Sequence, residues 1–157
     1  MVRLRRTTEV DLPLVLETEA SQDSARWLGT TGEAWHQAAL LDPDQEHLVI
    51  CDYGAVVGFV VLAGVSTPRV ELRRLVLCEQ VRGRGLGRLA LRAVLARPVH
   101  ADRVWLDVKT TNERAQSLYR AEGFAVDRVL EDAGQEPDGT AYSLVLMSRT
   151  VLRVDEG

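Results

Sequence analysis

The sequence has little of what several protein classes require. Its 157 residues include two cysteines, Cys51 and Cys78, too few for a disulfide framework. The longest nearly apolar run, residues 55–65, is too short to span a bilayer, which takes about 20 residues. No signal-peptide pattern is visible, so we expect a cytoplasmic protein with no membrane segment. The three histidines lack the spacing of metal ligands, so no metal site is expected.

Basic residues are also in the minority. The chain has 19 basic and 23 acidic residues, which gives a net charge of −4. A general nucleic-acid surface is not expected, because phosphate binding requires a net basic face. Hydrophobic residues make up 46 % and charged residues 27 % of the chain, as is usual for a globular protein. The length predicts a single domain over residues 1–157.

The spacing of apolar residues and of helix-breaking residues predicts a mixed α/β fold. Strands are expected at residues 2–6, 46–51, 55–65, 69–77, 103–109, 124–130 and 140–150. Helices are expected at residues 9–19 and 31–41, from Leu86 to before Pro98, and from Thr111 or Asn112 to Glu122. This order predicts antiparallel hairpins towards both ends of the chain and a strand–helix–strand crossover in the middle.

A glycine-rich turn, Gln80-Val81-Arg82-Gly83-Arg84-Gly85-Leu86-Gly87, joins a predicted strand to a predicted helix. Glycines let the backbone approach a ligand closely, and the helix N-terminus adds partial positive charge. With Arg82, Arg84 and Arg88 as nearby cations, the turn predicts a phosphate or pyrophosphate site. A Walker A loop is excluded, because no Gly-Lys-Ser/Thr occurs, and position 88 lacks the glycine of a Rossmann fingerprint. Asp107 lies twenty residues after Gly87, the place of the acidic residue that binds the ribose in a dinucleotide site, so this pattern still weakly favours dinucleotide binding.

Two segments resemble one known family. Gln80-x-x-Gly83-x-Gly85 resembles the signature Gln/Arg-x-x-Gly-x-Gly/Ala of the GNAT superfamily of acetyl-CoA-dependent N-acetyltransferases. The segment from Asn112 to Phe124 resembles the family's Asn-x-x-Ala-x-x-Leu-Tyr-x-x-x-Gly-Phe at every fixed position. The resemblance implies a GNAT-like fold, a central, mostly antiparallel mixed sheet flanked by helices. The cofactor would lie in a wedge between two splayed parallel strands, here residues 69–77 and 103–109.

The resemblance also implies an activity, transfer of the acetyl group of acetyl-CoA to a primary amine by direct attack in a ternary complex. The pantetheine arm would pair with the backbone of residues 75–77, and the pyrophosphate would rest on the amides of residues 82–87. The implied cofactor-binding residues are Leu75, Val76, Leu77, Arg82, Gly83, Arg84, Gly85, Leu86, Gly87, Arg88, Asn112 and Tyr119.

Two residues are candidate catalytic groups. Tyr119 lies seven residues after Asn112, on the same helix face, and would donate a proton to the leaving thiolate. Glu71, six residues before Leu77, would be the base, as in some family members. Each has a structural alternative. Tyr119 could simply pack against the core, Glu71 could form a salt bridge with Arg73 or Arg74, and Asn112 could serve as a helix cap.

The acceptor would be a small-molecule or peptide amine. Two segments offer carboxylates and aromatics suited to a cationic amine, with His36 either in an acceptor cleft or on the surface. These residues are Asp23, Trp27, Glu33, Trp35 and His36, and then Glu131, Asp132, Glu136 and Asp138. The resemblance also allows a homodimer. The alternative function is a non-catalytic module on the same fold that binds and senses an acyl-CoA or a dinucleotide.

Overall fold

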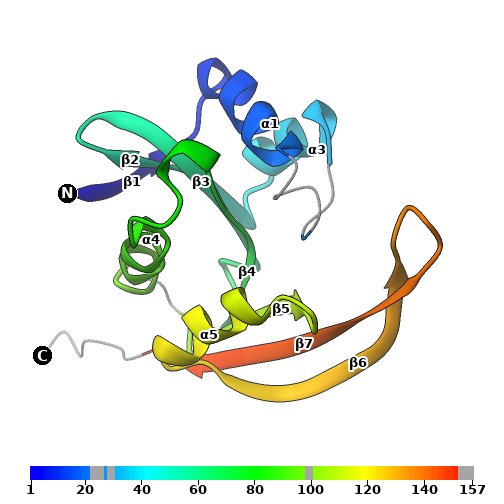
Figure 1. The fold of residues 1–157 in the computed structure, drawn as a ribbon. Coiled ribbons are helices and arrows are strands. Elements are labelled where there is room, and N and C mark those ends of the chain that lie inside the picture. Colours follow the sequence, from blue (N-terminus) through cyan, green and yellow to red (C-terminus); the bar gives the residue numbers. More distant parts are fainter. Residues whose placement is uncertain (22–26, 28–30, 98–100, 152–157) are drawn as a thin grey trace, which may run out of the picture.

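The computed structural model describes residues 1–21, 27, 31–97 and 101–151. The seven strands of the described residues form one sheet in the order β1-β2-β3-β4-β5-β7-β6 (Figure 1). The strands are β1 (Val2–Arg6), β2 (Gln45–Asp52), β3 (Ala55–Ala63), β4 (Arg69–Leu77), β5 (Arg103–Lys109), β6 (Ala125–Gln135) and β7 (Ala141–Thr150). Of these neighbours, β4 and β5 are parallel and the others antiparallel. The mixed, mostly antiparallel sheet predicted from the sequence is therefore confirmed.

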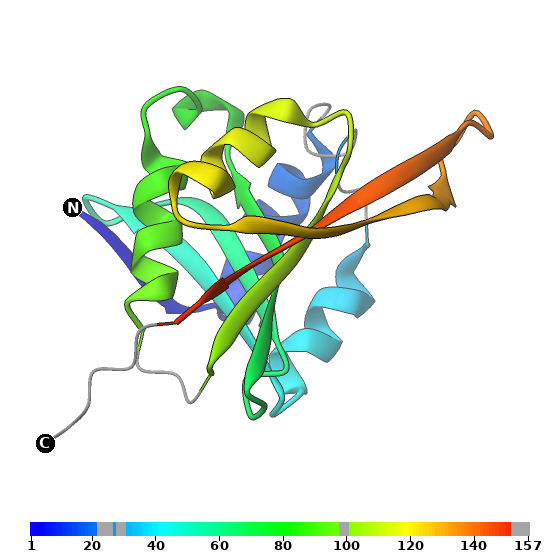
Figure 2. The same ribbon diagram turned by 90° about the horizontal axis from the view of Figure 1, so that it is seen from below.

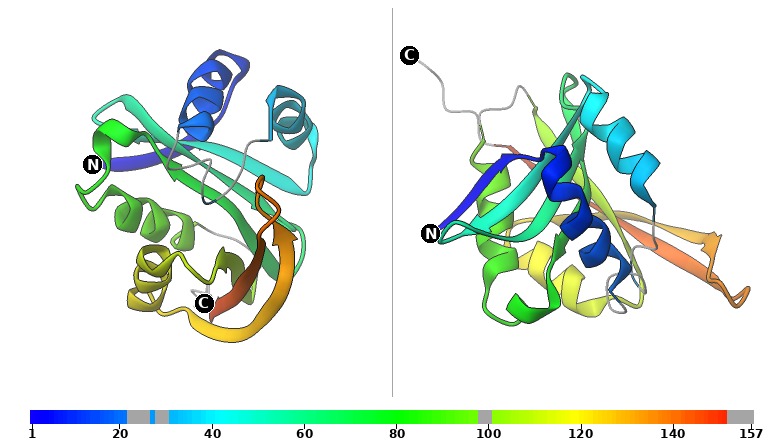
Figure 3. Two further views of the ribbon diagram at one scale, coloured as in Figure 1. Left: turned by 45° about the vertical axis from the view of Figure 1, so that its right-hand side comes forward. Right: turned by 90° about the horizontal axis from the view of Figure 1, so that it is seen from above.

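Helices cover both faces of the sheet. On one face lie α1 (Leu12–Ala20), which follows the 3-10 turn Glu9–Asp11, and α3 (Glu33–Leu41). On the other face lie α4 (Leu86–Leu95) and α5 (Glu113–Ala121), as Figure 3 shows. No helix in the described part of the chain is both long enough and apolar enough to cross a membrane.

Strand β3 is apolar along most of its length because it is buried on both faces. Val60 and Leu62 belong to the larger core cluster, which α4 residues complete. Phe59 and Val61 belong to a second cluster with Val15 of α1 on the opposite face. A strand between two helical layers needs apolar residues at successive positions, which explains the long apolar run in the sequence.

The parallel pair β4–β5 is hydrogen-bonded only at its beginning. The residue pairs are Arg69–Arg103, Val70–Val104 and Glu71–Trp105. Beyond Glu71, an irregularity in the β3–β4 pairing leaves Arg73 without a partner in the ladder, and β5 pairs over its full length with β7. The ends of β4 and β5 therefore diverge, which confirms the predicted wedge between splayed strands.

The sequence prediction was wrong about the last hairpin. We expected a strand to end at residue 130, but β6 continues to Gln135 and pairs again with β7 at Gly134 and Gln135. Most β6 side chains are exposed, so the apolar alternation that marks a half-buried strand is missing there. The long hairpin projects beyond the body of the sheet (Figure 2).

Candidate functional site

The glycine-rich turn presents open backbone where α4 begins. Gly83 and Gly85 have φ angles of 81° and 74°, in the left-handed region that favours glycine. A Cβ atom at either position would meet no atom within 4 Å, so the turn is open on that side. The first N–H groups of α4 have no carbonyl partner within the helix, and the helix dipole is positive at this end. The turn can therefore bind an anion through its backbone.

Two of the three predicted cations contact other parts of the protein. Arg82 folds back and donates from Nη2 and Nε to the Leu77 carbonyl oxygen, at 3.1 and 3.3 Å. The Arg88 Nε lies 3.3 Å from Glu122 Oε1. Arg84 is exposed. Arg82 thus binds the carbonyl oxygen of the last residue of β4.

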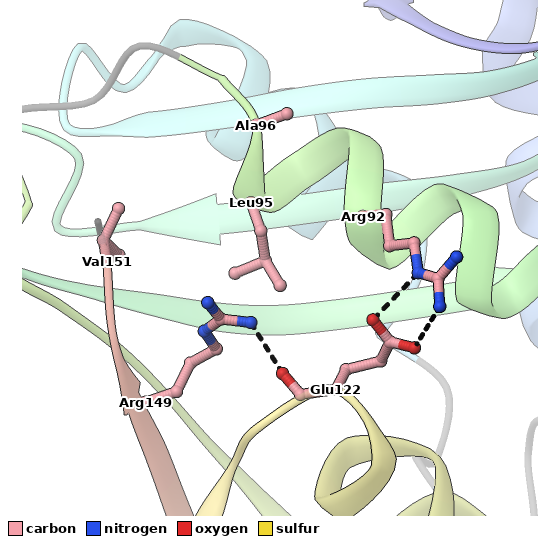
Figure 4. A pocket seen from close by; sticks show the side chains of 6 residues that line it. All are labelled: Arg92, Leu95, Ala96, Glu122, Arg149 and Val151. Carbon is pink, nitrogen blue, oxygen red and sulfur yellow. Dashed lines mark hydrogen bonds and ion pairs between the residues drawn. The ribbon is translucent and has the colours of Figure 1, made fainter. Parts of the chain in front are cut away.

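A separate shallow pocket of about 270 Å³ lies at the opposite end of α4 (Figure 4). Its lining residues are Arg92, Leu95, Ala96, Glu122, Arg149 and Val151. Arg92 donates to both carboxylate oxygens of Glu122, and Arg149 donates to the Glu122 carbonyl at 2.6 Å. Because Glu122 binds both arginines, this pocket is a weak candidate for an anion site.

At the end of β4, one backbone edge is hydrogen-bonded to β3 and the other faces the wedge between β4 and β5. Leu75, Val76 and Leu77 pair with β3, but none of them pairs with β5. Gly58 of β3 lies so close that a Cβ there would collide with the Val76 carbonyl oxygen. The wedge edge of residues 75–77 is therefore not paired with β5, and the expected pairing of an extended ligand with this edge stays a prediction.

Helix α5 lies beside the glycine-rich turn. A Cβ on Gly87 would lie 3.6 Å from Leu77 Cδ1 and 3.8 Å from Leu118 Cδ2, which brings β4, α4 and α5 together. Asn112 caps α5, accepting at 3.2 Å from the Ala115 backbone N–H, so the structural alternative for this residue is present. Tyr119 packs edge-on against Phe124, and burial raises the pKa of its phenol to about 12. The phenol is protonated at neutral pH and can donate.

Two carboxylates flank the wedge, one of which the sequence analysis did not assign to the site. Glu71 Oε1 accepts from Arg73 Nε at 2.7 Å, the salt bridge considered as its alternative. Asp107 of β5 lies on the face opposite the buried side chains Val104, Leu106 and Val108. Loss of surrounding solvent raises the pKa of Asp107, and the charge of Glu71 raises it further. The alternation along β5 could have identified Asp107.

Several residues predicted to attract a cationic acceptor contact cations of this chain. The Trp35 ring lies 5.7 Å from the Arg74 guanidinium, and Glu136 forms an ion pair with Lys109 at 2.6 Å. Asp138 accepts from the Thr140 backbone N–H. Glu131 and Asp132 are exposed, and Asp23 lies outside the described residues.

His36 is not on the surface, and the expectation of a surface histidine was wrong. Its side chain is fully buried in a hydrogen-bonded chain that starts at Glu19 of α1. Glu19 Oε1 accepts from Thr31 Oγ1 at 2.7 Å and lies 3.3 Å from His36 Nε2. His36 Nδ1 lies 2.9 Å from His47 Nε2, and His47 Nδ1 lies 2.8 Å from Thr7 Oγ1. Among the described residues, no group of three or more potential ligands is arranged to hold a metal ion.

Known proteins share this sequence pattern and this fold. The family model described as "Acetyltransferase (GNAT) family" matches residues 11–124. An uncharacterized N-acetyltransferase of Mycobacterium tuberculosis (strain ATCC 25618 / H37Rv) is 34 % identical over 90 residues, which are 56 % of this chain and 58 % of that protein. The chain thus matches little more than half the length of this relative.

Solved structures with the same fold include two N-acetyltransferases. The spermidine N-acetyltransferase from Vibrio cholerae, in complex with CoA and spermine, has a TM-score of 0.86 at 16 % identity, covering 96 % of this chain and 95 % of that one. The ribosomal-protein-S18-alanine N-acetyltransferase from Escherichia coli has a TM-score of 0.78 at 19 % identity, covering 100 % and 98 %. At these identities the likeness shows the fold alone.

Proposed function

Because the chain belongs to the acetyltransferase (GNAT) family, we propose that it transfers the acetyl group of acetyl-CoA to a primary amine. The observation that carries this proposal is the juxtaposition of two stretches of open backbone. The wedge edge of β4 can pair with an extended arm, and the glycine-rich turn beside it can bind an anion. Coenzyme A combines these two features in one molecule, an amide-containing arm that ends at a pyrophosphate.

Each part of the cofactor has a proposed set of contacts. The arm pairs with the backbone of Leu75–Leu77, after Arg82 leaves the Leu77 carbonyl for the phosphates. The pyrophosphate accepts from the amides of residues 82–87, with Arg84 and Arg88 as further cations. Asn112 and Tyr119 contact the cofactor from α5.

The proposed reaction is a direct attack of the amine nitrogen on the thioester carbonyl. A C–N bond forms and the C–S bond breaks, while a backbone N–H near Val76 or Leu77 stabilises the oxyanion. The proton lost by the amine goes to the carboxylate pair Glu71–Asp107, in which loss of surrounding solvent and the charge of Glu71 raise the pKa of Asp107 and so make it a better proton acceptor. Tyr119 donates a proton to the leaving thiolate.

Thiol release from acetyl-CoA, measured against a library of amines, tests the proposed function. The library should contain polyamines, aminoglycosides, amino acids and peptides with free N-termini. We expect release that depends on at least one amine, together with a product heavier by one acetyl group in mass spectrometry. Tight binding of acetyl-CoA without release for any amine would contradict catalysis and favour the binding and sensing module.

Replacing Gly85 by valine tests the cofactor site. The β-branched side chain would strain a backbone with a φ of 74° and project from the open side of the turn. We expect the affinity for acetyl-CoA, measured by calorimetry, to fall at least tenfold, which is about 1.4 kcal/mol. Gly54→Val in the β2–β3 turn, with a φ of 82° and equally open surroundings, is the matched control and should leave the affinity unchanged. Unchanged affinity in folded Gly85→Val would refute the assignment.

A further inference from the structure

Lys109 is the only lysine of the chain, and its ammonium group is held by two residues of the β6–β7 hairpin. Lys109 Nζ lies 2.6 Å from Glu136 Oε1 and 4.6 Å from the centroid of the Tyr142 ring. The lysine side chain is only 11 % exposed, although lysine is usually a surface residue. A carboxylate pairs with an ammonium group by charge and hydrogen bonding, and an aromatic face attracts it through its π electrons. Glu136 and Tyr142 thus have the chemistry of an alkylammonium site.

The hairpin positions both of these groups through its own contacts. The Glu136 backbone N–H donates to the Thr140 carbonyl oxygen at 2.8 Å, which fixes the start of the turn. Gly134 pairs with Tyr142 across the hairpin, and a Cβ at Gly134 would overlap the Tyr142 ring, so the ring lies directly over this glycine. None of these contacts involves Lys109. We therefore expect the alkylammonium site to persist when the lysine side chain is shortened.

The alkylammonium site lies on the face of the sheet that carries the proposed base. Side chains alternate along a strand, so Lys109 and Asp107 of β5 share one face, opposite the buried Val108. Lys109 pairs with Leu144 of β7, and Tyr142 follows on the same face of β7 by the same alternation. The backbones of Lys109 and Asp107 are about 7 Å apart along the strand. A second amino group, a few carbons from an amine that reacts at Asp107, can therefore reach the site.

The ammonium of Lys109 keeps a second ammonium group out of this site. Like charges repel each other, and a tethered lysine has a higher effective concentration than a free amine. Glu136, which the sequence analysis expected to attract a cationic acceptor, is thus bound by a cation of the chain itself. The positive charge of Lys109 also remains on the face where the acceptor would lie.

We propose that Glu136 and Tyr142 form an alkylammonium site that Lys109 fills, and that Lys109 thereby selects acceptors without a second cationic group near the reacting amine. Removal of the lysine charge leaves the Glu136 carboxylate and the Tyr142 ring for an ammonium group of the acceptor. The enzyme then gains activity towards diamines. The selection of acceptors rests on the proposed function, whereas the alkylammonium site does not.

Lys109→Ala, with n-propylammonium as the probe, tests the alkylammonium site. Alanine keeps Cβ, and propylammonium has the three carbons and the nitrogen that the substitution removes. We expect propylammonium chloride to raise the melting temperature of the variant by about 2–4 °C, relative to sodium chloride at the same ionic strength. Wild type should not respond, and neither should Lys109→Ala combined with Glu136→Gln. Uncharged 1-propanol should stabilise none of these proteins.

No response in folded Lys109→Ala, or an equal response in wild type, overturns the alkylammonium site. If Lys109→Ala does not fold, Lys109→Met decides in the same way with the ammonium ion as the probe. Methionine ends at the carbon that carries the lysine nitrogen, so ammonium replaces only the group that is missing. Ammonium chloride should then stabilise Lys109→Met more than sodium chloride does, and an equal effect of the two salts overturns the site.

The selection of acceptors is tested with two amines of equal length, n-butylamine and 1,4-diaminobutane. In Lys109→Met, the ratio of kcat/KM for the diamine to that for the monoamine should rise about tenfold over wild type. Lys109→Arg keeps the positive charge and should keep the wild-type ratio. Arg128→Met removes an exposed cation from the same hairpin and is the matched control. An unchanged ratio in Lys109→Met overturns the selection. A protein that releases no thiol with any amine contradicts the proposed function, and the melting temperatures still decide the alkylammonium site.

Discussion

Replacing Glu71 by glutamine and Asp107 by asparagine together is expected to lower kcat/KM by about 10²–10⁴-fold and to abolish the acidic limb of the pH profile. A primary amine is mostly protonated at neutral pH, and it attacks only after losing that proton. Both substitutions keep the size of the side chain and remove only the ability to take the proton. Affinity for acetyl-CoA, measured by calorimetry, should hardly change, because neither residue is among those proposed to bind the cofactor.

The single variants show which carboxylate receives the proton. A loss of about 10²-fold or more in Glu71→Gln alone assigns the proton to Glu71, as the sequence analysis expected. A loss of about twofold would leave Glu71 as the partner of Arg73 and assign the proton to Asp107. Asp127→Asn, on the exposed edge strand β6, is the control for a lost surface charge. If the double variant keeps nearly full activity, the pair is not the base.

Tyr119→Phe is expected to lower kcat by about 10–10³-fold while the affinity for acetyl-CoA stays the same. The substitution keeps the ring that packs on Phe124 and deletes only the hydroxyl. Because burial raises the pKa of the phenol to about 12, the wild-type residue carries its proton throughout the working range. The coenzyme A thiolate leaves more readily when that proton arrives as the C–S bond breaks.

A structural role for Tyr119 gives the opposite pattern. If Tyr119 only packs against Phe124, kcat stays intact and any effect of the substitution is on stability. Measuring kcat and the melting temperature on the same variant separates the two roles. Tyr53 is 91 % exposed, so Tyr53→Phe is the control for removing a tyrosine hydroxyl away from the proposed site. Full activity in Tyr119→Phe would show that solvent, and not Tyr119, gives the proton to the leaving thiolate.

The features that could be predicted from the sequence are those with a local physical cause. Left-handed backbone favours glycine, so Gly83 and Gly85 marked the turn and the start of α4. The cap at Asn112 marked the start of α5, and the β-rich runs marked the strands. The splay of β4 and β5 was expected only through the family resemblance, because no single segment encodes it.

The features that the sequence analysis missed depend on contacts between distant segments. His36 and His47 meet because α3 packs on β2, and this burial was not visible at either position alone. Arg82 was expected to face a ligand, yet it folds onto Leu77, whose carbonyl is open only because the strands splay. Loss of surrounding solvent raises the pKa of Asp107 most, and Glu71 on a neighbouring strand adds to this, so strand order was needed to connect the two residues.

The short β4–β5 ladder also has a mechanical consequence. Three residue pairs join the sub-sheet β1–β4 to the sub-sheet β5-β7-β6. A ligand that pairs with the wedge edge of β4 would fill the gap beyond these three pairs and extend the contact between the two sub-sheets for as long as it is bound. If the proposed cofactor pairs there, we expect its binding to stiffen the connection between the two halves of the sheet and its release to loosen that connection.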